Sequence, residues 1–157
     1  MERLRRLEQV HVANPIYFVT CCTEGRRAFL ARPRVHAAFV QFCQEAARRN
    51  IFVGRYILMP DHAHLFVKLP PPSDNLSNWM KSLKNYLSKK LNELGSTAPH
   101  WQKGFFDHIL RSGESYSHKW LYVVENCVRA SLVKCWTDWP YQGEIHPLSF
   151  DERMRRS

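Results

Sequence analysis

Residues 51–69 read IFVGRYILMPDHAHLFVKL, and this stretch decides the fold. It consists of two runs rich in β-branched and aromatic residues, a composition typical of strands. Pro60 and Asp61 between the runs form a tight turn, so the two strands are expected to pair as an antiparallel hairpin. Successive side chains of a strand point to opposite faces of a sheet, and His62 and His64 therefore share one face.

Further strands and helices are expected on both sides of this hairpin. The predicted strands are 16–22, 51–59, 62–69 and 105–110, and the predicted helices are 33–46, 76–94 and 114–126, the last with a continuation to 132 left open. The order β-α-β-β-α-β followed by a helix predicts an α+β fold. We expect a ferredoxin-like antiparallel sheet with helices on one face, a C-terminal helix that carries a tyrosine, and coil after it.

Length and charge restrict the organisation and the partners. A chain of 157 residues with 45% apolar residues is expected to form one domain over 1–157, with a basic tail at 150–157. The formal net charge is +9 and the pI is about 9.6, which favours binding to polyanions. Nucleic acid is the preferred partner over a membrane, because no predicted helix combines a broad apolar face with a solidly basic one.

The chain also gives an expectation about its compartment. Residues 1–6 are charged and lead into no apolar signal segment, and no apolar run approaches the length of a membrane span. The five cysteines are odd in number and form no CxxC pair, so we expect reduced thiols. These features predict a cytoplasmic protein that is not associated with a membrane.

Four residues form a candidate catalytic set. Two imidazoles on one strand face, His62 and His64, can bind one metal ion. On the predicted third helix Tyr122 and Asn126 are four residues apart and share a face, so a phenol lies beside an amide oxygen. Together the two faces would give a metal with an open position next to a tyrosine nucleophile, which suits attack on a phosphodiester. The alternatives are a solvated histidine face and a tyrosine that packs in the core.

Other tyrosines and a histidine compete for roles in the same chemistry. Tyr116 is a second candidate nucleophile, but Trp120 at the position four residues on cannot bind a metal, so it ranks below Tyr122. His118 lies one turn before Tyr122 and is either a proton relay or an ordinary surface histidine. Tyr86 lies among lysines and either contacts DNA or packs in the protein.

Basic and aromatic residues that cluster in the second half of the chain are candidates for DNA binding. They are Lys81, Lys84, Lys103, Arg111, Trp101 and Phe105, with Lys89, Lys90 and Phe106 in the same mixture. Cations follow phosphates and rings stack on unpaired bases. The alternatives are a solvated helix face for the lysines and core packing for the rings. Asp107 and His108 either support a metal ligand from behind or mark a polar strand edge.

Five segments, taken in order, resemble a known family. They are YFVT at 17–20, MPDHAHL at 59–65, KSLK at 81–84, WQKGFFDH at 101–108 and LYVVEN at 121–126. Through them the chain resembles the single-tyrosine HUH transposases, and within these the REP-associated tyrosine transposases. The segments run through most of the chain, and their shared order and spacing make the resemblance specific.

The resemblance implies a reaction on single-stranded DNA folded as a hairpin. Tyr122 would attack a phosphodiester, form a 5′-phosphotyrosine link and release a 3′-hydroxyl, and resealing would reverse the step on another strand. The metal would be Mg²⁺ or Mn²⁺, held by His62, His64 and Asn126. Relatives act as monomers or as dimers, so the resemblance leaves open whether this chain forms a homodimer.

Two positions depart from the family pattern. Ala63 stands where a bulkier apolar residue is usual between the histidines, and Cys127 stands where proline often follows the asparagine. Neither change removes a catalytic atom, although the first affects packing behind the site and the second the end of the helix. The alternative function is a non-catalytic ferredoxin-like module that binds hairpin DNA or RNA. The intact set of two histidines, a tyrosine and an asparagine favours the enzyme.

Overall fold

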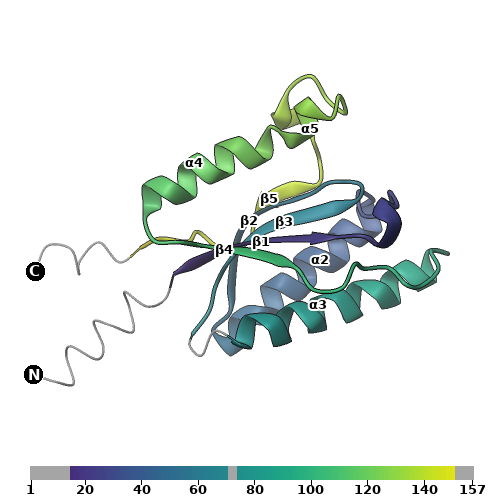
Figure 1. Cartoon of the computed structure of the whole chain (residues 1–157), viewed down its shortest axis with the longest axis horizontal. Helices are drawn as coiled ribbons and strands as arrows, with labels where there is room; N and C mark the ends of the chain where they lie inside the picture. Colours follow the sequence, from purple (N-terminus) through teal and green to yellow (C-terminus); the bar gives the residue numbers. More distant parts are fainter. Residues whose placement is uncertain (1–14, 71–73, 151–157) are drawn as a thin grey trace, which may run out of the picture.

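A five-stranded antiparallel sheet forms the centre of the computed structural model, which describes residues 15–70 and 74–150 (Figure 1). In spatial order the strands are β4 (Phe106–Leu110), β1 (Ile16–Cys22), β3 (His62–Lys68), β2 (Phe52–Leu58) and β5 (Gln142–Glu144). The first four strands have the predicted ferredoxin-like order. The predicted basic tail at 150–157, apart from Phe150, and the charged residues 1–6 lie outside the described ranges.

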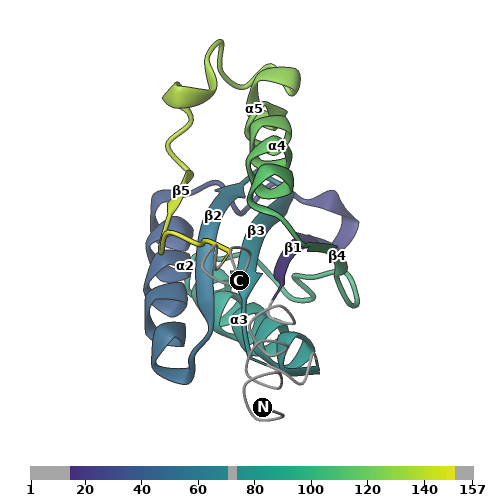
Figure 2. The ribbon, with the colours of Figure 1, turned by 90° about the vertical axis from the view of Figure 1, so that its left-hand side faces the viewer.

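The helices cover both faces of the sheet. They are α2 (Pro33–Ala46), α3 (Asp74–Glu93), α4 (Gly113–Val124) and α5 (Asn126–Arg129), with short 3₁₀ turns η1 (Glu24–Arg26), η2 (Ala47–Arg49) and η3 (Trp136–Asp138). Figures 1 and 2 show α2 and α3 side by side against one face and α4 across the other. The predicted order of strands and helices is therefore confirmed, with the tyrosine helix alone on its face.

Most element boundaries follow from local signals in the sequence. Pro33 opens α2 at its first position, and Asn50 closes the following turn in the left-handed region at φ 61°. Ser112 caps α4, because its side chain accepts a hydrogen bond from the backbone N–H of Ser115 at 3.1 Å. The predicted third helix differs in one respect: it ends at Val124, and Asn126 begins a separate short helix.

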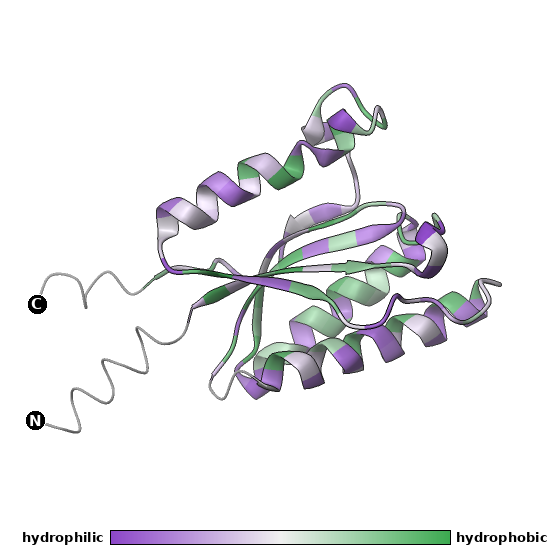
Figure 3. Cartoon of the chain, in the orientation of Figure 1, coloured by the Kyte–Doolittle hydropathy of each residue, from purple (hydrophilic) through white to green (hydrophobic). Residues whose placement is uncertain are grey.

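The alternation of side chains along the strands builds two apolar layers. Figure 3 shows apolar residues, in green, along the central strands and recurring on α2 and α3. Val19 and Leu65 belong to the layer under α2 and α3, whereas Phe18 and Phe66 belong to the layer under α4. Ala63 is 3% exposed and faces α2 and α3, on the side opposite the histidines, as strand alternation requires. The histidine face of β3 therefore lies on the α4 side of the sheet.

An irregularity in β2 explains the position of Tyr116. The register between β2 and β3 shifts between Val53 and Tyr56, as in a β-bulge. Gly54 lies within this shift, and a Cβ added there would meet the Tyr116 hydroxyl oxygen at 2.6 Å. That oxygen accepts a hydrogen bond from the backbone N–H of Arg55 at 3.0 Å. Tyr116 is thus a buried packing residue, consistent with its lower rank as a nucleophile.

The C-terminal region is more regular than predicted. Residues after 132, expected to be coil, contain η3 and the short strand β5, which adds to the edge of β2. This pairing is missed because three residues with a central Gly143 carry no strand pattern; the partner strand supplies the order.

Two further predictions bear on chain-wide properties. All five cysteines are unpaired, and Cys135 alone among them is exposed. Across the described ranges, no helix has the length and hydropathy needed to cross a membrane.

Cys127, one of the two departures from the family pattern, is fully buried in the layer under α4, where it packs as a small apolar residue.

Candidate active site

The predicted histidine pair lies side by side on the sheet face that α4 crosses. The ring centres of His62 and His64 are 4.8 Å apart and their planes meet at 81°. Both residues are half-buried. Strand alternation brings the two rings to one face, because they stand at positions i and i+2 of β3. Their mutual placement is therefore the one predicted.

The neighbouring strand β1 holds the His64 ring from two sides. The Thr20 hydroxyl oxygen lies 2.8 Å from Nδ1 of His64 in the partner position of the β1–β3 pairing. The Phe18 ring stacks on the His64 ring at 5.2 Å and 17°. Burial is the largest cause that lowers the pKa of His64, to about 3, and electrostatic interactions with the neighbouring His62, Lys119, Arg129 and Arg26 act in the same direction. The imidazole of His64 is therefore neutral near pH 7.

A carboxylate and a guanidinium hold the His62 ring. Nδ1 of His62 lies 2.8 Å from a carboxylate oxygen of Asp61, and Nε of Arg26 donates to the other oxygen at 2.9 Å. Burial raises the pKa of Asp61, but the hydrogen bonds from His62 and Arg26 outweigh it, and the pKa is lowered overall. Gly25 (φ 63°) and the following Arg26 (φ 54°) both adopt left-handed backbone conformations. This sharp turn aims the guanidinium at Asp61.

The orientation of both rings fits a metal ligand pair. Each Nδ1 has a polar partner, and neither Nε2 has a hydrogen-bond partner among the described residues. Metal-binding histidines commonly have one ring nitrogen held in this way while the other binds the ion. In the described part of the chain, no three His, Cys, Asp or Glu side chains are grouped to hold a metal ion. The amide of Asn126, which the sequence suggests as a further ligand, has its side-chain oxygen accepting a hydrogen bond from Arg129.

Sequence reasoning missed the residues that hold the two rings. Thr20, Asp61 and Arg26 fill this role, whereas Asp107 and His108 make no hydrogen bond to His62 or His64 in the described structure. Asp61 has a weak local signal, because it directly precedes a candidate ligand. Thr20 becomes recognisable only once β1 and β3 are paired in register.

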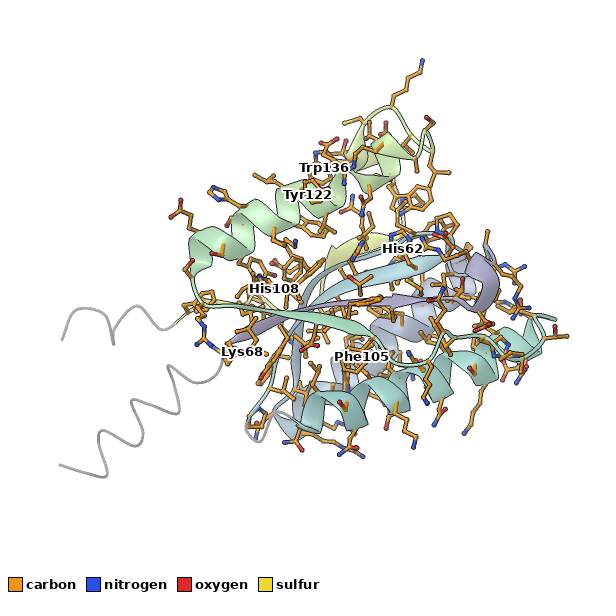
Figure 4. All side chains as sticks on the ribbon, viewed as in Figure 1. His62, Lys68, Phe105, His108, Tyr122 and Trp136 are labelled. Atoms are coloured by element: carbon orange, nitrogen blue, oxygen red, sulfur yellow. The ribbon has the colours of Figure 1, made fainter. Side chains whose placement is uncertain are left out.

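The candidate nucleophile Tyr122 lies on α4 above this face, and its side chain is 64% exposed (Figure 4). The Arg129 guanidinium lies over the Tyr122 ring, 4.5 Å from its centre. The same guanidinium donates to the Tyr122 carbonyl oxygen at 2.9 Å and to the side-chain oxygen of Asn126. One cation thus links the tyrosine to the asparagine across the break between α4 and α5.

A second cation lies between the tyrosine and the histidine pair. Nζ of Lys119 is 4.9 Å from the centre of the Phe18 ring and 5.9 Å from that of the Tyr122 ring. Phe18 in turn stacks on His64. Lys119 and Arg129 are also two of the charges that act on His64. The tyrosine helix and the histidine strand therefore share one electropositive neighbourhood.

A shallow groove of about 460 Å³ runs beside the tyrosine. Its lining residues come from β4 and α4: His108, Leu110, Ser115, His118, Lys119 and Tyr122. His118 is exposed and borders this groove on the same helix as Tyr122. Both predicted roles of His118, relay and surface residue, remain compatible with this position.

Most of the predicted DNA-binding residues are gathered on the other side of the molecule. Lys81, Lys84, Lys103, Trp101 and Phe105 line one pocket of about 460 Å³ beside α3, and the exposed Arg111 lies outside it. Two of them also have structural roles. Lys84 donates to the carbonyl oxygens of Gln102, at 3.1 Å, and Gly104, and the Trp101 indole donates to the Lys84 carbonyl at 3.0 Å.

Two of the remaining predictions concern aromatic residues. Tyr86 is half-buried and its ring lies 5.1 Å from that of Phe42, which agrees with the packing alternative. Phe105 is half-buried against the core under α2 and α3, whereas the adjacent Phe106 is 72% exposed. Phe106 therefore presents the open ring of this pair.

A histidine pair on a ferredoxin-like sheet thus faces a helix that carries an exposed tyrosine, the arrangement expected from the resemblance to single-tyrosine HUH transposases. The chain belongs to the family described as Transposase IS200 like, which matches residues 11–121. Tyr122 and Asn126 lie just beyond the matched range.

Individual relatives point to the same branch. The chain is 23% identical to the REP-associated tyrosine transposase of Escherichia coli K12, over 83% of this chain and 77% of that protein. It is also 23% identical to a Haemophilus influenzae protein provisionally given the same name, over 84% of this chain and 85% of that protein. A solved structure of a REP-associated tyrosine transposase bound to a REP hairpin has a TM-score of 0.67 and 21% identity, covering 87% of this chain and 90% of that one. This last likeness shows the fold.

Proposed function

We propose that this transposase nicks and rejoins hairpin-containing single-stranded DNA through a 5′-phosphotyrosine intermediate at Tyr122. In this proposal His62, His64 and Asn126 hold a divalent ion, Mg²⁺ or Mn²⁺. The observation that carries it is the histidine pair itself: both Nδ1 atoms are held by polar partners on the sheet face under the tyrosine helix. We further infer that the reaction takes place in the cytoplasm, where DNA is available and free thiols persist.

The state of the two rings supports metal binding. A neutral imidazole binds a metal without first losing a proton, and the low pKa of His64 keeps it neutral well below pH 7. In the tautomer with the proton on Nδ1, the Nε2 lone pair of each ring is available to a metal, and the partners of Nδ1, Thr20 for His64 and Asp61 for His62, support that tautomer. A bound divalent ion would polarise the scissile phosphate and offset the charge that develops on it.

In the proposed step, the hydroxyl oxygen of Tyr122 forms a bond to phosphorus while the bond from phosphorus to the 3′ oxygen breaks. The released 3′ oxygen gains a proton and the phenol loses one, so the step is balanced without nucleotide or redox cofactor. Rejoining is the reverse step, in which a 3′-hydroxyl attacks the phosphotyrosine. Lys119 and Arg129 support this assignment, because they bring positive charge to the Tyr122 ring where the phosphate must approach.

The proposed substrate agrees with the charge of the protein and with a solved relative. A net charge of +9 favours a polyanion. The relative of known structure is described as bound to a REP hairpin. Lys81 and Lys103 are exposed beside one pocket and remain candidates for phosphate contacts.

A covalent-adduct assay tests the proposed function. Purified protein would be mixed with end-labelled hairpin strands taken from the flanks of its own gene, with Mn²⁺ or with EDTA, and separated on a denaturing gel. We expect a metal-dependent shifted band that is lost in Tyr122→Phe. Tyr116→Phe is the matched control, because Tyr116 lies on the same helix and is buried, and it should keep the band.

The alternative is a non-catalytic module that binds hairpin DNA or RNA. In this alternative, the exposed cations and the sheet of the protein would bind the nucleic acid without cleaving it. Salt-sensitive binding of the hairpins with no adduct in Mn²⁺, for strands that span both flanks, would contradict the enzyme and favour this module. An adduct retained in Tyr122→Phe would contradict the choice of nucleophile.

A further inference from the structure

An exposed aromatic ring lies on the edge strand next to the histidine site. Phe106 begins β4 and is 72% exposed, the largest exposure among the large apolar residues of the described structure. It is paired with Thr20 on β1, and Thr20 is paired with His64 on β3. Directly paired residues in antiparallel strands point to the same face. Phe106, Thr20 and His64 therefore form one row across three strands.

Folding does not explain this ring. Phe106 belongs to neither apolar layer of the described structure, whereas Phe105 before it packs against the layer under α2 and α3. Single exposed apolar side chains are common on protein surfaces, so the exposure of Phe106 does not by itself indicate a binding surface. What indicates a binding role is the position of Phe106 in one row with Thr20 and His64, beside the candidate active site.

The surroundings of Phe106 connect it to the nucleophile. Two residues on, His108 lies on the same face of β4 and lines the same groove as Tyr122. Figure 4 labels both residues. Lys119 lies in the same groove and provides a positive charge along it. Phe106 lies outside the groove lining, two residues before His108 on the same strand. A single strand that continues from the groove past His108 would have its phosphates near Lys119 and its bases near the Phe106 ring.

We propose that Phe106 is a stacking platform for an unpaired base of the DNA strand that reaches Tyr122. Neighbouring strands are about 4.8 Å apart, so about 10 Å separates the strand of Phe106 from that of His64. The stacked base would therefore belong to a nucleotide within a few positions of the phosphate that reacts. Every base has an aromatic face, so the platform binds bases with little sequence preference. The route of the strand rests on the proposed function, but the binding measured below does not require catalysis.

The test compares a strand with bases and a strand without them. The two probes are a fluorescein-labelled 12-residue oligodeoxyadenylate and an abasic strand of the same length and charge, titrated with the full chain in EDTA and followed by anisotropy. Base stacking contributes about 1–3 kcal/mol, so Phe106→Ala is expected to weaken binding of the adenylate strand about 5- to 150-fold. The affinity of Phe106→Ala for the abasic strand should change less than about two-fold. Phe106→Trp should keep wild-type affinity for both strands.

Ile109→Ala is the matched control, because Ile109 lies on the same edge strand, is 38% exposed and points to the opposite face. It should leave both affinities unchanged. An unchanged adenylate affinity in Phe106→Ala would overturn the proposal. An equal loss of affinity for the adenylate and the abasic strand would overturn it as well. Phe106 would then affect binding through the protein fold or through contacts to the DNA backbone, and not through a base. The adduct assay tests the proposed function separately. If wild type forms no adduct but Phe106→Ala weakens binding of the adenylate strand alone, the proposed function is wrong and the stacking role of Phe106 is supported.

Discussion

The hydroxyl oxygen of Thr20 lies 2.8 Å from Nδ1 of His64, across two paired strands and 44 residues of sequence. Together with the stacked Phe18 ring, this contact sets the orientation of the imidazole. The free ring nitrogen, Nε2, then points away from Thr20 and is available to a metal. The contact thus connects strand register directly to the proposed metal chemistry.

Removal of this hydroxyl should weaken metal binding. Thr20→Val keeps the side-chain shape but leaves Nδ1 of His64 without its partner. We expect Mn²⁺ affinity, measured by calorimetric titration, to fall about 10- to 100-fold, as is typical when a group behind a metal ligand is lost. Thr20→Ser keeps the hydroxyl and should bind nearly as wild type. Equal affinities for Thr20→Val and wild type would contradict the role given to Thr20.

The stability of the protein should depend on pH through His64. The pKa of His64 in the folded protein is about 3, below the ordinary value of 6.5. Between these values the unfolded chain takes up a proton that folded His64 does not, so the free energy of unfolding falls as the pH falls. We expect wild type in EDTA to lose about 1–2 kcal/mol more than His64→Gln between pH 6.5 and pH 5, measured by urea unfolding. Parallel pH profiles for the two proteins would contradict this.

Arg129 should affect chemistry more than stability. Its guanidinium lies over the Tyr122 ring and donates to Asn126, and the residue is exposed. Arg129→Lys keeps the charge but loses the planar group that makes both contacts. We expect adduct formation to slow about 10-fold, a loss of about 1.4 kcal/mol of transition-state stabilisation, with little change in melting temperature. Arg48→Lys, on an exposed arginine next to α2, is the charge-matched control and should react normally. Equal rates for the two variants would rule out a special role for Arg129.

The close approach at Gly54 should make any larger residue destabilising. A Cβ there would lie 2.6 Å from both the Tyr116 hydroxyl oxygen and Cδ1 of Leu148. We expect Gly54→Ala to lower the free energy of unfolding by about 1–3 kcal/mol in urea titrations. Gly113→Ala is the control, because its Cβ would meet Cδ2 of Phe150 at an ordinary 3.8 Å. A stability of Gly54→Ala equal to that of the control would show that this contact relaxes freely.

Much of the fold and part of the site could be predicted from local patterns. Alternation along residues 62–68 places His62 and His64 on one face, and it places Ala63 on the other. The spacing of apolar residues predicts α2 and α3, and the order of elements predicts the topology. Such patterns are readable because they are properties of contiguous residues with a fixed geometric period.

The remaining features of the site depend on tertiary structure. Thr20 and Phe106 join the row of His64 only because β1 pairs with β3 and β4 in one register. Arg26 reaches Asp61 through a left-handed turn. Periodicity alone could not decide between Tyr116, which is buried against Gly54, and Tyr122, which is exposed. The sequence by itself determined most of the helices and strands and the sheet face of each side chain on the long strands. The packed structure decided the partners, the added strand β5 and the break between α4 and α5. Contacts between distant residues depend on strand register and helix placement, which no local period encodes.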